Sequence, residues 1–453
     1  MTNDVTTPGI VPARIDLDSY EENFDDLYKP LNSHEAFVAA DRCYFCYDAP
    51  CVVACPTDID IPLFIRQIST GTPKEAAKTI LQKNILGGMC ARVCPTETLC
   101  EEACVREISE GKPVEIGKLQ RFATDKIMDE AAHPFHRMSD TNKRVAVVGA
   151  GPAGLACAHR LSMYGHKIDL FEARDKLGGL NEFGIAAYKT VNNFAKREVQ
   201  WLLEIGGITP KLGIKLGKDI HLADIEEDYD AVFLAIGLGG VNELSLENEE
   251  VFGVANAVNF ISDLRQANQL KDIPIGRNVV VIGGGMTAID AGVQSKLLGA
   301  ENVTIVYRRG EDQMSASLKE REHATSAGVR ILTNLSPKRI VAKDGKLQEI
   351  VFAYAKSENG DYKIGSEELN LKADQIFKAI GQTCKQVNEE VNTYSKKIKT
   401  KEDGRIGSQK IWAGGDCIHS GEDLTVTAVA QGRDAAEDIN KFLNNSSRIR
   451  ERN

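Results

Sequence analysis

The sequence predicts an α+β multidomain fold in which a helical N-terminal domain precedes two α/β domains, the first split by the second. The chain has 453 residues, enough for about three domains. At two places, near residues 149 and 283, an apolar strand runs into a glycine-rich turn and then a helix. Eight of the eleven cysteines lie between Cys43 and Cys104, among stretches with helical periodicity. These three observations separate the helical domain from the α/β domains.

The composition excludes several classes of function. With 42% hydrophobic and 26% charged residues, it is that of an ordinary globular protein. The formal net charge of −10 argues against nucleic acid or anionic lipid as the main partner. The N-terminus lacks the basic and apolar regions of a secretory signal, and no apolar run approaches the roughly 18 residues of a membrane span. We therefore expect a cytoplasmic protein that binds neither nucleic acid nor membrane.

A dinucleotide-binding fingerprint begins where the strand from Val145 runs into Gly149-x-Gly151-x-x-Gly154. A helix-compatible segment follows, and a second strand ends on Glu172. In such a βαβ unit the glycines permit a tight turn, close backbone approach to a pyrophosphate, and close packing of helix on strand. The helix N-terminus faces the phosphates, and the acidic residue accepts the ribose hydroxyls. The stretch therefore predicts a Rossmann-type dinucleotide site.

Later glycine-containing stretches fit the same site. The first is a second glycine turn just after the fingerprint, at Gly178-Gly179. The second is Gly237, which ends an apolar strand, and the third is Gly414-Gly415-Asp416, which joins a strand to a helix. Asp416 suits a carboxylate that binds ribitol hydroxyls, and the N-terminus of the following helix would face a flavin ring. The candidate residues are Gly179, Leu180, Gly237, Gly415, Asp416 and Thr425.

The fingerprint then recurs. A strand from Asn278 leads into glycines and a helix that begins near residue 286, and the next strand ends on two arginines. The candidate residues are Gly283, Gly285, Thr287, Ala288, Arg308 and Arg309. Arginine at the place of Glu172 can bind a 2′-phosphate, which favours NADPH over NADH. The alternative is that the arginines form only a solvated strand end.

The clustered cysteines indicate metal rather than disulfides in a reducing compartment. Their Cys-Pro steps resemble bacterial ferredoxin loops, in which three close cysteines hold one iron–sulfur cluster and the fourth reaches the other cluster. By this spacing, the first three cysteines share one cluster and the fourth serves a second. A pair of four-cysteine zinc sites is the alternative, although zinc sites usually show paired Cys-x2-Cys knuckles. The two runs are Cys43-x2-Cys46-x4-Cys51-x3-Cys55 and Cys90-x3-Cys94-x5-Cys100-x3-Cys104.

Together these features predict a flavoprotein that oxidises a nicotinamide, with FAD in the first α/β unit and NAD(P)H in the second. Flavin connects two-electron nicotinamide chemistry to one-electron iron–sulfur chemistry. The predicted path therefore runs from NAD(P)H through FAD and two clusters to an external acceptor. Hydride transfer depends on positioning, so no catalytic side chain is assigned. A zinc-bound regulatory scaffold is the alternative from another class.

Nearly the whole chain resembles the electron-input half of dihydropyrimidine dehydrogenase and the related small subunit of glutamate synthase. The matching runs are Cys-x2-Cys-x-Asp-Ala-Pro-Cys at 43–51, Ala-Arg-Val-Cys-Pro at 91–95, and the glycine turn at 149–155. Both families share an all-helical iron–sulfur domain followed by split FAD and NAD(P) domains. The expected domains are 1–140 for two [4Fe–4S] clusters, 141–255 and 374–453 for FAD, and 256–373 for NAD(P).

The resemblance also implies the ligands of the clusters. It assigns one [4Fe–4S] cluster to Cys43, Cys46, Cys51 and Cys104, and the other to Cys55, Cys94, Cys100 and Gln120, which leaves Cys90 unused. Gln120 is the discriminating residue, because glutamate synthase small subunits carry glutamate there. Two positions depart from the family pattern. Met286 stands in place of an aspartate, and Lys189 replaces an arginine near the flavin.

The resemblance implies a heteromeric enzyme of pyrimidine catabolism. Long dihydropyrimidine dehydrogenases continue into an FMN-containing barrel, which has no counterpart in these residues. The expected partner is therefore a separate FMN-containing subunit that converts uracil and thymine to their 5,6-dihydro forms. The alternative within enzymes is an electron donor to a glutamate synthase-like amidotransferase.

Overall fold

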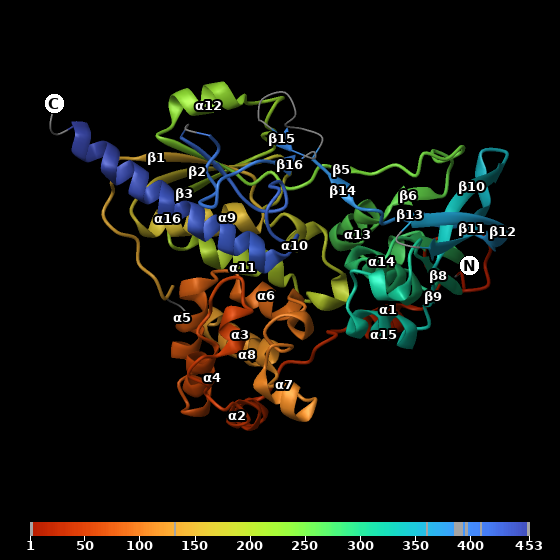
Figure 1. Ribbon diagram of the computed structural model, residues 1–453, viewed down its shortest axis with the longest axis horizontal. Coiled ribbons are helices and arrows are strands. Elements are labelled where there is room, and N and C mark those ends of the chain that lie inside the picture. The colour runs from red at the N-terminus through yellow and green to blue at the C-terminus, as the bar shows by residue number, and fades with distance from the viewer. Residues whose placement is uncertain are drawn as a thin grey trace. The chain divides into compact units, whose positions relative to one another are not determined.

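The computed structural model describes residues 3–130, 133–358, 361–384, 393–394, 397–407 and 410–450 (Figure 1). The chain forms two compact units. Unit 1 comprises Met1–Leu27, Phe183–Val191 and Val241–Gln382, and unit 2 comprises Tyr28–Glu182, Asn192–Gly240 and Thr383–Asn453. No helix in the part of the chain that the structure describes combines the length and apolarity needed to cross a bilayer.

The N-terminal part of unit 2 is a helical domain, as the sequence predicts. Its helices start at sequence-encoded caps: the Asn32 side chain accepts from the N–H groups of His34 and Glu35, and the Asp60 side chain accepts from that of Leu63. The apolar face of one helix buries positions 61, 64, 65 and 68, the spacing of a single helical stripe. The helices are α2 (Ser33–Asp41), α3 (Pro50–Val53), α4 (Ile61–Ser69), α5 (Pro73–Lys83), α6 (Gly87–Val93), α7 (Val105–Glu110) and α8 (Ile116–Met128).

Unit 2 also contains a five-stranded parallel sheet in the order β17-β4-β1-β2-β3. The chain leaves the central strand in one direction and returns on its other side, so a topological switch point lies between β1 and β4, where such sheets bind ligands. The strands are β1 (Arg144–Val148), β2 (Lys167–Glu172), β3 (Ile208–Leu212), β4 (Ala231–Leu234) and β17 (Ile411–Ala413). The helices are α9 (Pro152–Met163), α10 (Leu180–Phe183), α11 (Phe194–Leu203), α12 (Leu222–Asp228) and α16 (Thr425–Arg450).

Unit 1 repeats the same plan. Its parallel sheet has the order β6-β13-β7-β8-β9, and a three-stranded antiparallel sheet of β10-β11-β12 accompanies it. The strands are β6 (Val254–Asn256), β7 (Asn278–Ile282), β8 (Asn302–Val306), β9 (Arg330–Leu332), β10 (Leu335–Lys343), β11 (Lys346–Glu358), β12 (Asp361–Lys372) and β13 (Gln375–Lys378). The helices are α1 (Leu17–Asn23), α13 (Ala257–Gln266), α14 (Met286–Leu297) and α15 (Leu318–Ser326).

The hydrophobic cores follow the two units. One core of unit 2 joins the helical domain to the sheet, because it includes Phe64 and Leu119 as well as Val147 and Trp412. The cores of unit 1 are formed within that unit. The helical domain and the split α/β domain therefore share buried surface.

Several boundaries differ from simple expectation. The first forty residues carry Pro, Asp and Glu with little periodicity, which predicts an extended arm with about one helical turn, but the structure has α1 and α2 there. The sequence predicts a C-terminal helix from about Thr425 to Phe442, whereas the helix in the structure continues to Arg450. The predicted domain limits at 140, 255 and 373 stay predictions, since the structure separates two units and assigns 1–27 and 183–191 to unit 1.

Candidate functional site

The glycine turn at the end of β1 has a backbone that only glycine fits. Gly149 has φ +102°, and a Cβ on it would lie 2.2 Å from the carbonyl oxygen of Ala235. A Cβ on Gly154 would lie 1.9 Å from the carbonyl oxygen of Gly149. These contacts hold the start of α9 against the switch point between β1 and β4, where the fingerprint predicts the dinucleotide.

Two glycine turns lie backbone to backbone at this place. The N–H of Gly178 donates to the carbonyl of Ala150 at 2.8 Å, and a Cβ on Gly179 would lie 2.6 Å from the Cα of Gly151. A Cβ on Gly151 would meet only the Cα of Gly179, at 3.8 Å, so the space beyond it is open. This bare, open backbone fits the close approach of a pyrophosphate. Leu180, the neighbour of Gly179, begins α10 with an exposed side chain.

Glu172 lies at the end of β2, next to the same turn. Its Oε2 accepts from the N–H of Ala150 at 2.9 Å, and its Oε1 accepts from the N–H of Arg174 at 2.9 Å. The side chain is 9% exposed. A carboxylate held in this way at the second strand is where a Rossmann unit places its acceptor for ribose hydroxyls.

The remaining predicted FAD residues follow the neighbouring strands at the same edge of the sheet. Gly237 comes after β4, in open space with φ +60°. Gly415 comes after β17, and its N–H donates to Oε1 of Gln431 at 2.7 Å. The hydroxyl of Thr425, at the start of α16, donates to Oδ1 of Asn181 at 2.9 Å.

Asp416 lies half-buried beside Gly415. Burial, followed by the nearby carboxylate of Asp423, raises the pKa of Asp416 to about 6, with Lys397 opposing. A carboxylate that is poorly solvated without a ligand is suited to accept hydrogen bonds from ligand hydroxyls.

Unit 1 presents the second fingerprint in the same manner. A Cβ on Gly283 would lie 2.2 Å from the carbonyl oxygen of Ala379, which follows β13, and one on Gly285 would lie 3.1 Å from Oγ of Ser315. Thr287 and Ala288 form the first turn of α14, with Ala288 fully buried. Arg308 and Arg309 follow β8 and are exposed. The structure thus gathers the predicted nicotinamide residues at the carboxyl edge of one sheet.

Lys189 has partners other than the predicted flavin. Its Nζ forms ion pairs with Asp290 and Glu320, each at 2.8 Å, within unit 1. The side chain is buried, and both carboxylates engage its charge. The structure offers no support for Lys189 as a flavin contact, so this assignment stays a prediction.

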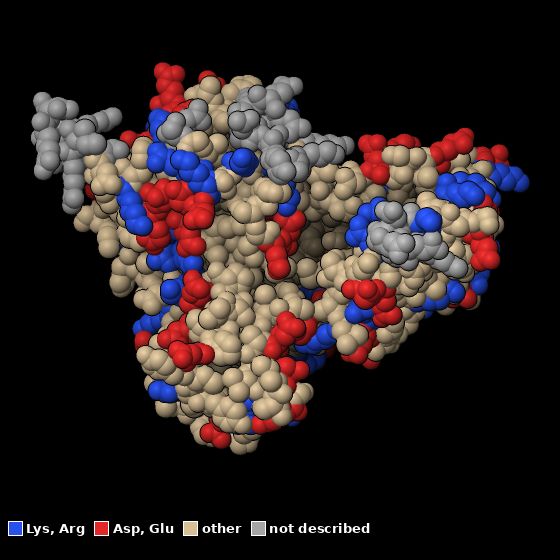
Figure 2. All heavy atoms as spheres, in the orientation of Figure 1, with Lys and Arg blue, Asp and Glu red and all other residues tan. Residues whose placement is uncertain are grey.

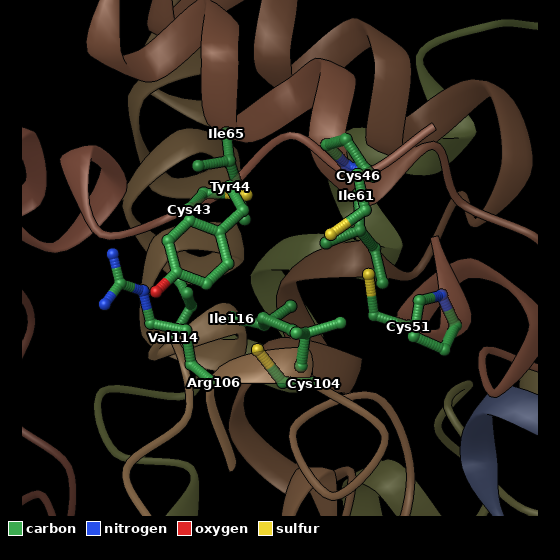
Figure 3. A pocket seen from close by; sticks show the side chains of 13 residues that line it. Cys43, Tyr44, Cys46, Cys51, Ile61, Ile65, Cys104, Arg106, Val114 and Ile116 are labelled. Atoms are coloured by element: carbon green, nitrogen blue, oxygen red, sulfur yellow. The ribbon is translucent and has the colours of Figure 1, made fainter. Parts of the chain in front are cut away.

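The first predicted cluster set surrounds one cavity (Figure 3). Cys43, Cys46, Cys51 and Cys104 all line it, together with Ile61 and Ile65 of α4 and residues of α7. Burial raises the pKa of Cys51 to about 12, and the thiols of Cys43, Cys104 and Cys46 add to the effect. Metal binding lowers such a pKa because the ligand must be a thiolate. Four thiols from two distant segments therefore meet at one apolar cavity.

The three cysteines of the second predicted set, Cys55, Cys94 and Cys100, also lie near one another. The pKa of Cys94 is raised by a contact with the thiol of Cys90, by burial, and by the thiols of Cys100 and Cys55. Gln120, on α8, is 8% exposed, and its Nε2 donates to the carbonyl of Gly87 at 2.7 Å. This bond leaves the carbonyl oxygen Oε1 as the atom of Gln120 that is available to a metal. Cys90, unused in the expected ligand set, contacts Cys94 directly.

Zinc and iron–sulfur clusters place different demands on their ligands. Among the described residues, no three His, Cys, Asp or Glu side chains converge closely enough to bind a single ion. A tetrahedral zinc site needs four donors at about 2.0–2.3 Å from one point, whereas a [4Fe–4S] cluster is held by thiolates at separate irons. The four thiols around one apolar cavity are donors of the kind that hold such a cluster.

Sequence reasoning missed one contact at this site. Glu198 of α11 accepts from the N–H groups of Gly88 and Met89, at 2.8 and 3.0 Å, at the start of α6. The sequence shows only a glutamate within an amphipathic helix, which is typical of a solvated face. Its burial, at 1% exposed, follows from packing of segments more than a hundred residues apart.

Comparisons with known proteins agree with this architecture. Residues 20–132 match the family described as dihydropyrimidine dehydrogenase domain II, 4Fe–4S cluster, and residues 143–432 match the pyridine nucleotide-disulphide oxidoreductases. The glutamate synthase [NADPH] small chain of Escherichia coli K12 is 34% identical over 95% of this chain and 96% of that protein. The NAD-dependent dihydropyrimidine dehydrogenase subunit PreT of the same strain is 34% identical over 93% of this chain and 98% of that protein.

Solved structures show the same fold. Mycobacterium tuberculosis FprA in complex with NADPH has a TM-score of 0.58 at 18% identity, covering 68% of this chain and 86% of that one. Thioredoxin reductase of T. acidophilum has a TM-score of 0.52 at 17% identity, covering 66% and 99%. The predicted fold class and the predicted cofactors FAD, NAD(P)H and 4Fe–4S are confirmed by the family matches. Residues 20–132 thus form a 4Fe–4S domain of the dihydropyrimidine dehydrogenase type ahead of the pyridine nucleotide-disulphide oxidoreductase region. The chain belongs to the pyridine nucleotide-disulphide oxidoreductase family and is an NAD(P)H-dependent flavin and iron–sulfur oxidoreductase.

Proposed function

We propose that this chain is the electron-input subunit of a two-subunit dihydropyrimidine dehydrogenase. It oxidises NAD(P)H and passes electrons via FAD and two [4Fe–4S] clusters to a separate FMN-containing subunit, which reduces uracil and thymine to 5,6-dihydropyrimidines. Residues 1–140 hold the clusters, 141–255 and 374–453 hold FAD, and 256–373 hold the nicotinamide, with the site residues as predicted above. PreT, 34% identical, is named as a subunit of an NAD-dependent dihydropyrimidine dehydrogenase.

The observation that carries the proposal is the environment of Gln120. Its amide Nε2 donates to the carbonyl of Gly87 at 2.7 Å. A glutamate at this position would place a carboxylate oxygen against that carbonyl, two acceptors without a proton between them. The site therefore suits an amide, the residue of dihydropyrimidine dehydrogenases, and not the glutamate of glutamate synthase small subunits.

In this proposal the residues of the chain bind and position the two nucleotide cofactors. FAD, when bound, supplies the exchange between two-electron and one-electron chemistry. The bare backbone at Gly151 and Gly179 receives its pyrophosphate, Glu172 its ribose, and Asp416 its ribityl chain. In unit 1 the start of α14 receives the nicotinamide phosphates, and the exposed Arg308 and Arg309 favour a 2′-phosphate.

The surface around the first cysteine set supports a protein partner. Tyr47, Val53 and Ile108 are 100%, 86% and 81% exposed, and each follows a cysteine of that set closely in sequence. Figure 2 shows that uncharged side chains dominate the visible face of the helical domain. Exposed apolar side chains grouped in this way are typical of protein–protein contact surfaces.

A second candidate is the electron donor of a glutamate synthase-like amidotransferase. The glutamate synthase small chain is as similar to this chain as PreT, at 34% identity each. Overall identity does not separate the two functions, so the discrimination rests on Gln120.

The test uses the purified holoprotein, alone and with candidate partner subunits. Alone, it should oxidise NAD(P)H with an artificial dye and leave uracil unreduced. With an FMN-containing barrel subunit, NAD(P)H oxidation should become dependent on uracil, and Ile108→Ser should weaken that coupling while leaving dye reduction unchanged. Reduction of uracil by the isolated chain, or coupling only to an amidotransferase, would contradict the proposal.

A further inference from the structure

The helix α6 (Gly87–Val93) joins two of the proposed ligands of the second cluster. At its C-terminal end, Cys94 is the capping residue, and its N–H donates to the carbonyl of Cys90 at 2.9 Å. At its N-terminal end, the carbonyl of Gly87 accepts from Nε2 of Gln120 at 2.7 Å. A displacement of this seven-residue helix would therefore move one ligand and release the orientation of another.

The start of α6 is held by a side chain from the α/β domain. Oε1 of Glu198, on α11, accepts from the N–H groups of Gly88 and Met89. The contact is close enough to require glycine, since a Cβ on Gly88 would lie 2.7 Å from that oxygen and 2.6 Å from the ring of Phe194. Such N–H groups have no partner within the helix, so Glu198 satisfies two buried donors.

Arg92 reinforces the same junction. Its guanidinium lies 3.4 Å from the centroid of the Phe194 ring and donates to the carbonyl of Gly88 at 3.0 Å. It also forms two hydrogen bonds with Asp125 of α8, at 2.8 and 2.9 Å. Polar contacts thus fasten helices α6, α8 and α11 together, with the proposed ligand Cys94 capping α6 and Gln120 on α8.

We propose that Glu198 is a positioning residue for the second iron–sulfur cluster, acting through α6 on Cys94 and on the amide of Gln120. The inference deepens the proposed function, because it takes the cluster ligands from it. It gives the α/β domain a direct part in holding a cluster of the helical domain. Partners of this kind orient metal ligands and tune affinity and potential.

The chemical state of Glu198 suggests the matched variant. Burial raises the pKa of Glu198 to about 8, against the opposing effects of the Met89 N–H, Arg92 and the Gly88 N–H, while Asp125 adds to the rise. The side chain is therefore mostly uncharged at pH 7. Glu198→Gln keeps the acceptor oxygen and is likewise uncharged, whereas Glu198→Ala removes the acceptor.

The experiment measures the loss of iron from each cluster in the holoprotein. The two clusters' EPR signals are assigned with Cys43→Ser and Cys55→Ser, and the decay of each signal is followed during challenge with bathophenanthroline. Glu198→Ala should lose the Cys55-containing cluster about tenfold faster than wild type, as is typical when an outer partner of a metal ligand is removed. The Cys43-containing cluster should be unaffected, and Glu198→Gln should restore the wild-type rate. The exposed Gln200→Ala, on the same helix, is the control.

The inference would be overturned if the Cys55-containing cluster decayed at the same rate in Glu198→Ala as in wild type. It would also be overturned if that cluster were lost as fast in Glu198→Gln as in Glu198→Ala. If Glu198→Ala does not yield folded protein, Glu198→Asp, which withdraws the carboxyl by one methylene, replaces it in the comparison. Gln120→Glu is measured in parallel. Unaltered cluster spectra in that variant count against Gln120 as a ligand, while the Glu198 variants still decide the role of Glu198 through Cys94.

Discussion

Gly151 and Gly154 belong to one turn but have different physical reasons to be glycine. A Cβ on Gly151 would meet only the Cα of Gly179 at 3.8 Å, whereas one on Gly154 would overlap the carbonyl of Gly149. We expect Gly151→Ala to fold with an unchanged melting temperature and to lose at least about tenfold in FAD affinity, because the methyl group occupies the space for the pyrophosphate. Gly154→Ala should instead cost about 1–3 kcal/mol of stability from overpacking. Thermal unfolding and flavin titration of deflavinated protein separate the two effects.

Equal destabilisation by Gly151→Ala and Gly154→Ala would show that both glycines are needed only for packing. Gly206→Ala is the control, because its Cβ would meet no atom within 4 Å, although its φ of +78° carries the cost of a left-handed residue.

Replacing the carboxylate of Asp416 should raise the free energy of unfolding of the chain but weaken its binding of FAD. Its pKa rises from the ordinary value of 3.8 to about 6 on folding, chiefly through burial. The folded chain therefore holds this proton over a range in which the unfolded chain has lost it, so the free energy of unfolding falls as pH rises from about 4 to 6. Asp416→Asn removes this loss and should stabilise deflavinated protein at pH 7.5 by about 1–2 kcal/mol, while weakening FAD binding.

The measurement is thermal unfolding of deflavinated protein between pH 5 and pH 8. The advantage of Asp416→Asn should grow from pH 5 to about pH 7 and then level off. The exposed Glu402→Gln serves as the control. An advantage that is independent of pH, or unimpaired FAD affinity in Asp416→Asn, would contradict the assignment of this carboxylate.

At the scale of elements, the segment 183–191 is tied to the helices of unit 1. Lys189 pairs with Asp290 of α14 and Glu320 of α15. The hydroxyl of Tyr188 donates to Oδ1 of Asp290 at 3.2 Å, and the N–H of Ala187 donates to Oε1 of Gln294 at 2.9 Å. A segment that lies in sequence between parts of unit 2 is therefore anchored by charge and hydrogen bonds in unit 1.

Removing the ammonium should release this segment. Burial disfavours the charge of Lys189, but the carboxylates of Asp290 and Glu320 outweigh it and hold the pKa of Lys189 above its ordinary value. Lys189→Met leaves the buried carboxylate of Asp290 and the partly buried one of Glu320 without their cation, at a cost of about 3–5 kcal/mol. Hydrogen exchange of residues 183–191 should accelerate accordingly. Lys338→Met, which breaks an exposed pair with Glu368, should change exchange little. Unchanged protection of 183–191 in Lys189→Met would refute the anchoring role.

Sequence reasoning predicted the elements that depend on short-range patterns of residues. The strand–glycine–helix runs at Gly149 and Gly283, and the strand ends at Gly237 and Asp416, are fixed by short-range geometry, and the structure places each group at one sheet edge. Apolar spacing in the same way predicts helices over about 61–69 and 74–82, and the structure has them at Ile61–Ser69 and Pro73–Lys83.

The contacts that the sequence did not reveal join segments far apart in the chain. Arg14 is 1% exposed and donates to the carbonyl of Ile275 at 2.8 Å, although its surrounding sequence looks like an extended arm. Glu198 likewise has the local sequence of an exposed helical residue, and only packing across the fold buries it. Long-range contacts of this kind leave no periodic signal in the sequence. The ligand set of the second cluster was predicted only through family resemblance, since spacing alone counts eight thiols.

At the scale of the whole molecule, the hydrophobic cores predict how the protein comes apart. A single core of unit 2 contains residues of the iron–sulfur helices and of the FAD-binding sheet, such as Phe64 and Trp412, whereas Phe260 and Phe377 of unit 1 stack on each other within a separate core. Cooperative unfolding follows shared buried surface. The helical domain and the split α/β domain should therefore unfold together, and unit 1 independently of them.

Metal removal tests this division because ligands that bind only the folded state stabilise the part to which they bind. Calorimetry of the holoprotein should show two transitions, one raised by added NADP⁺ and assigned to unit 1, the other to unit 2. Chelation of the cluster iron should lower the second transition by several degrees and speed the release of FAD, even though the FAD residues lie outside the cysteine segment. The NADP⁺-dependent transition should stay in place. If chelation left FAD release unchanged, the shared core would not couple the stability of the iron–sulfur domain to that of the FAD-binding domain. That result would contradict the prediction that the two domains unfold together.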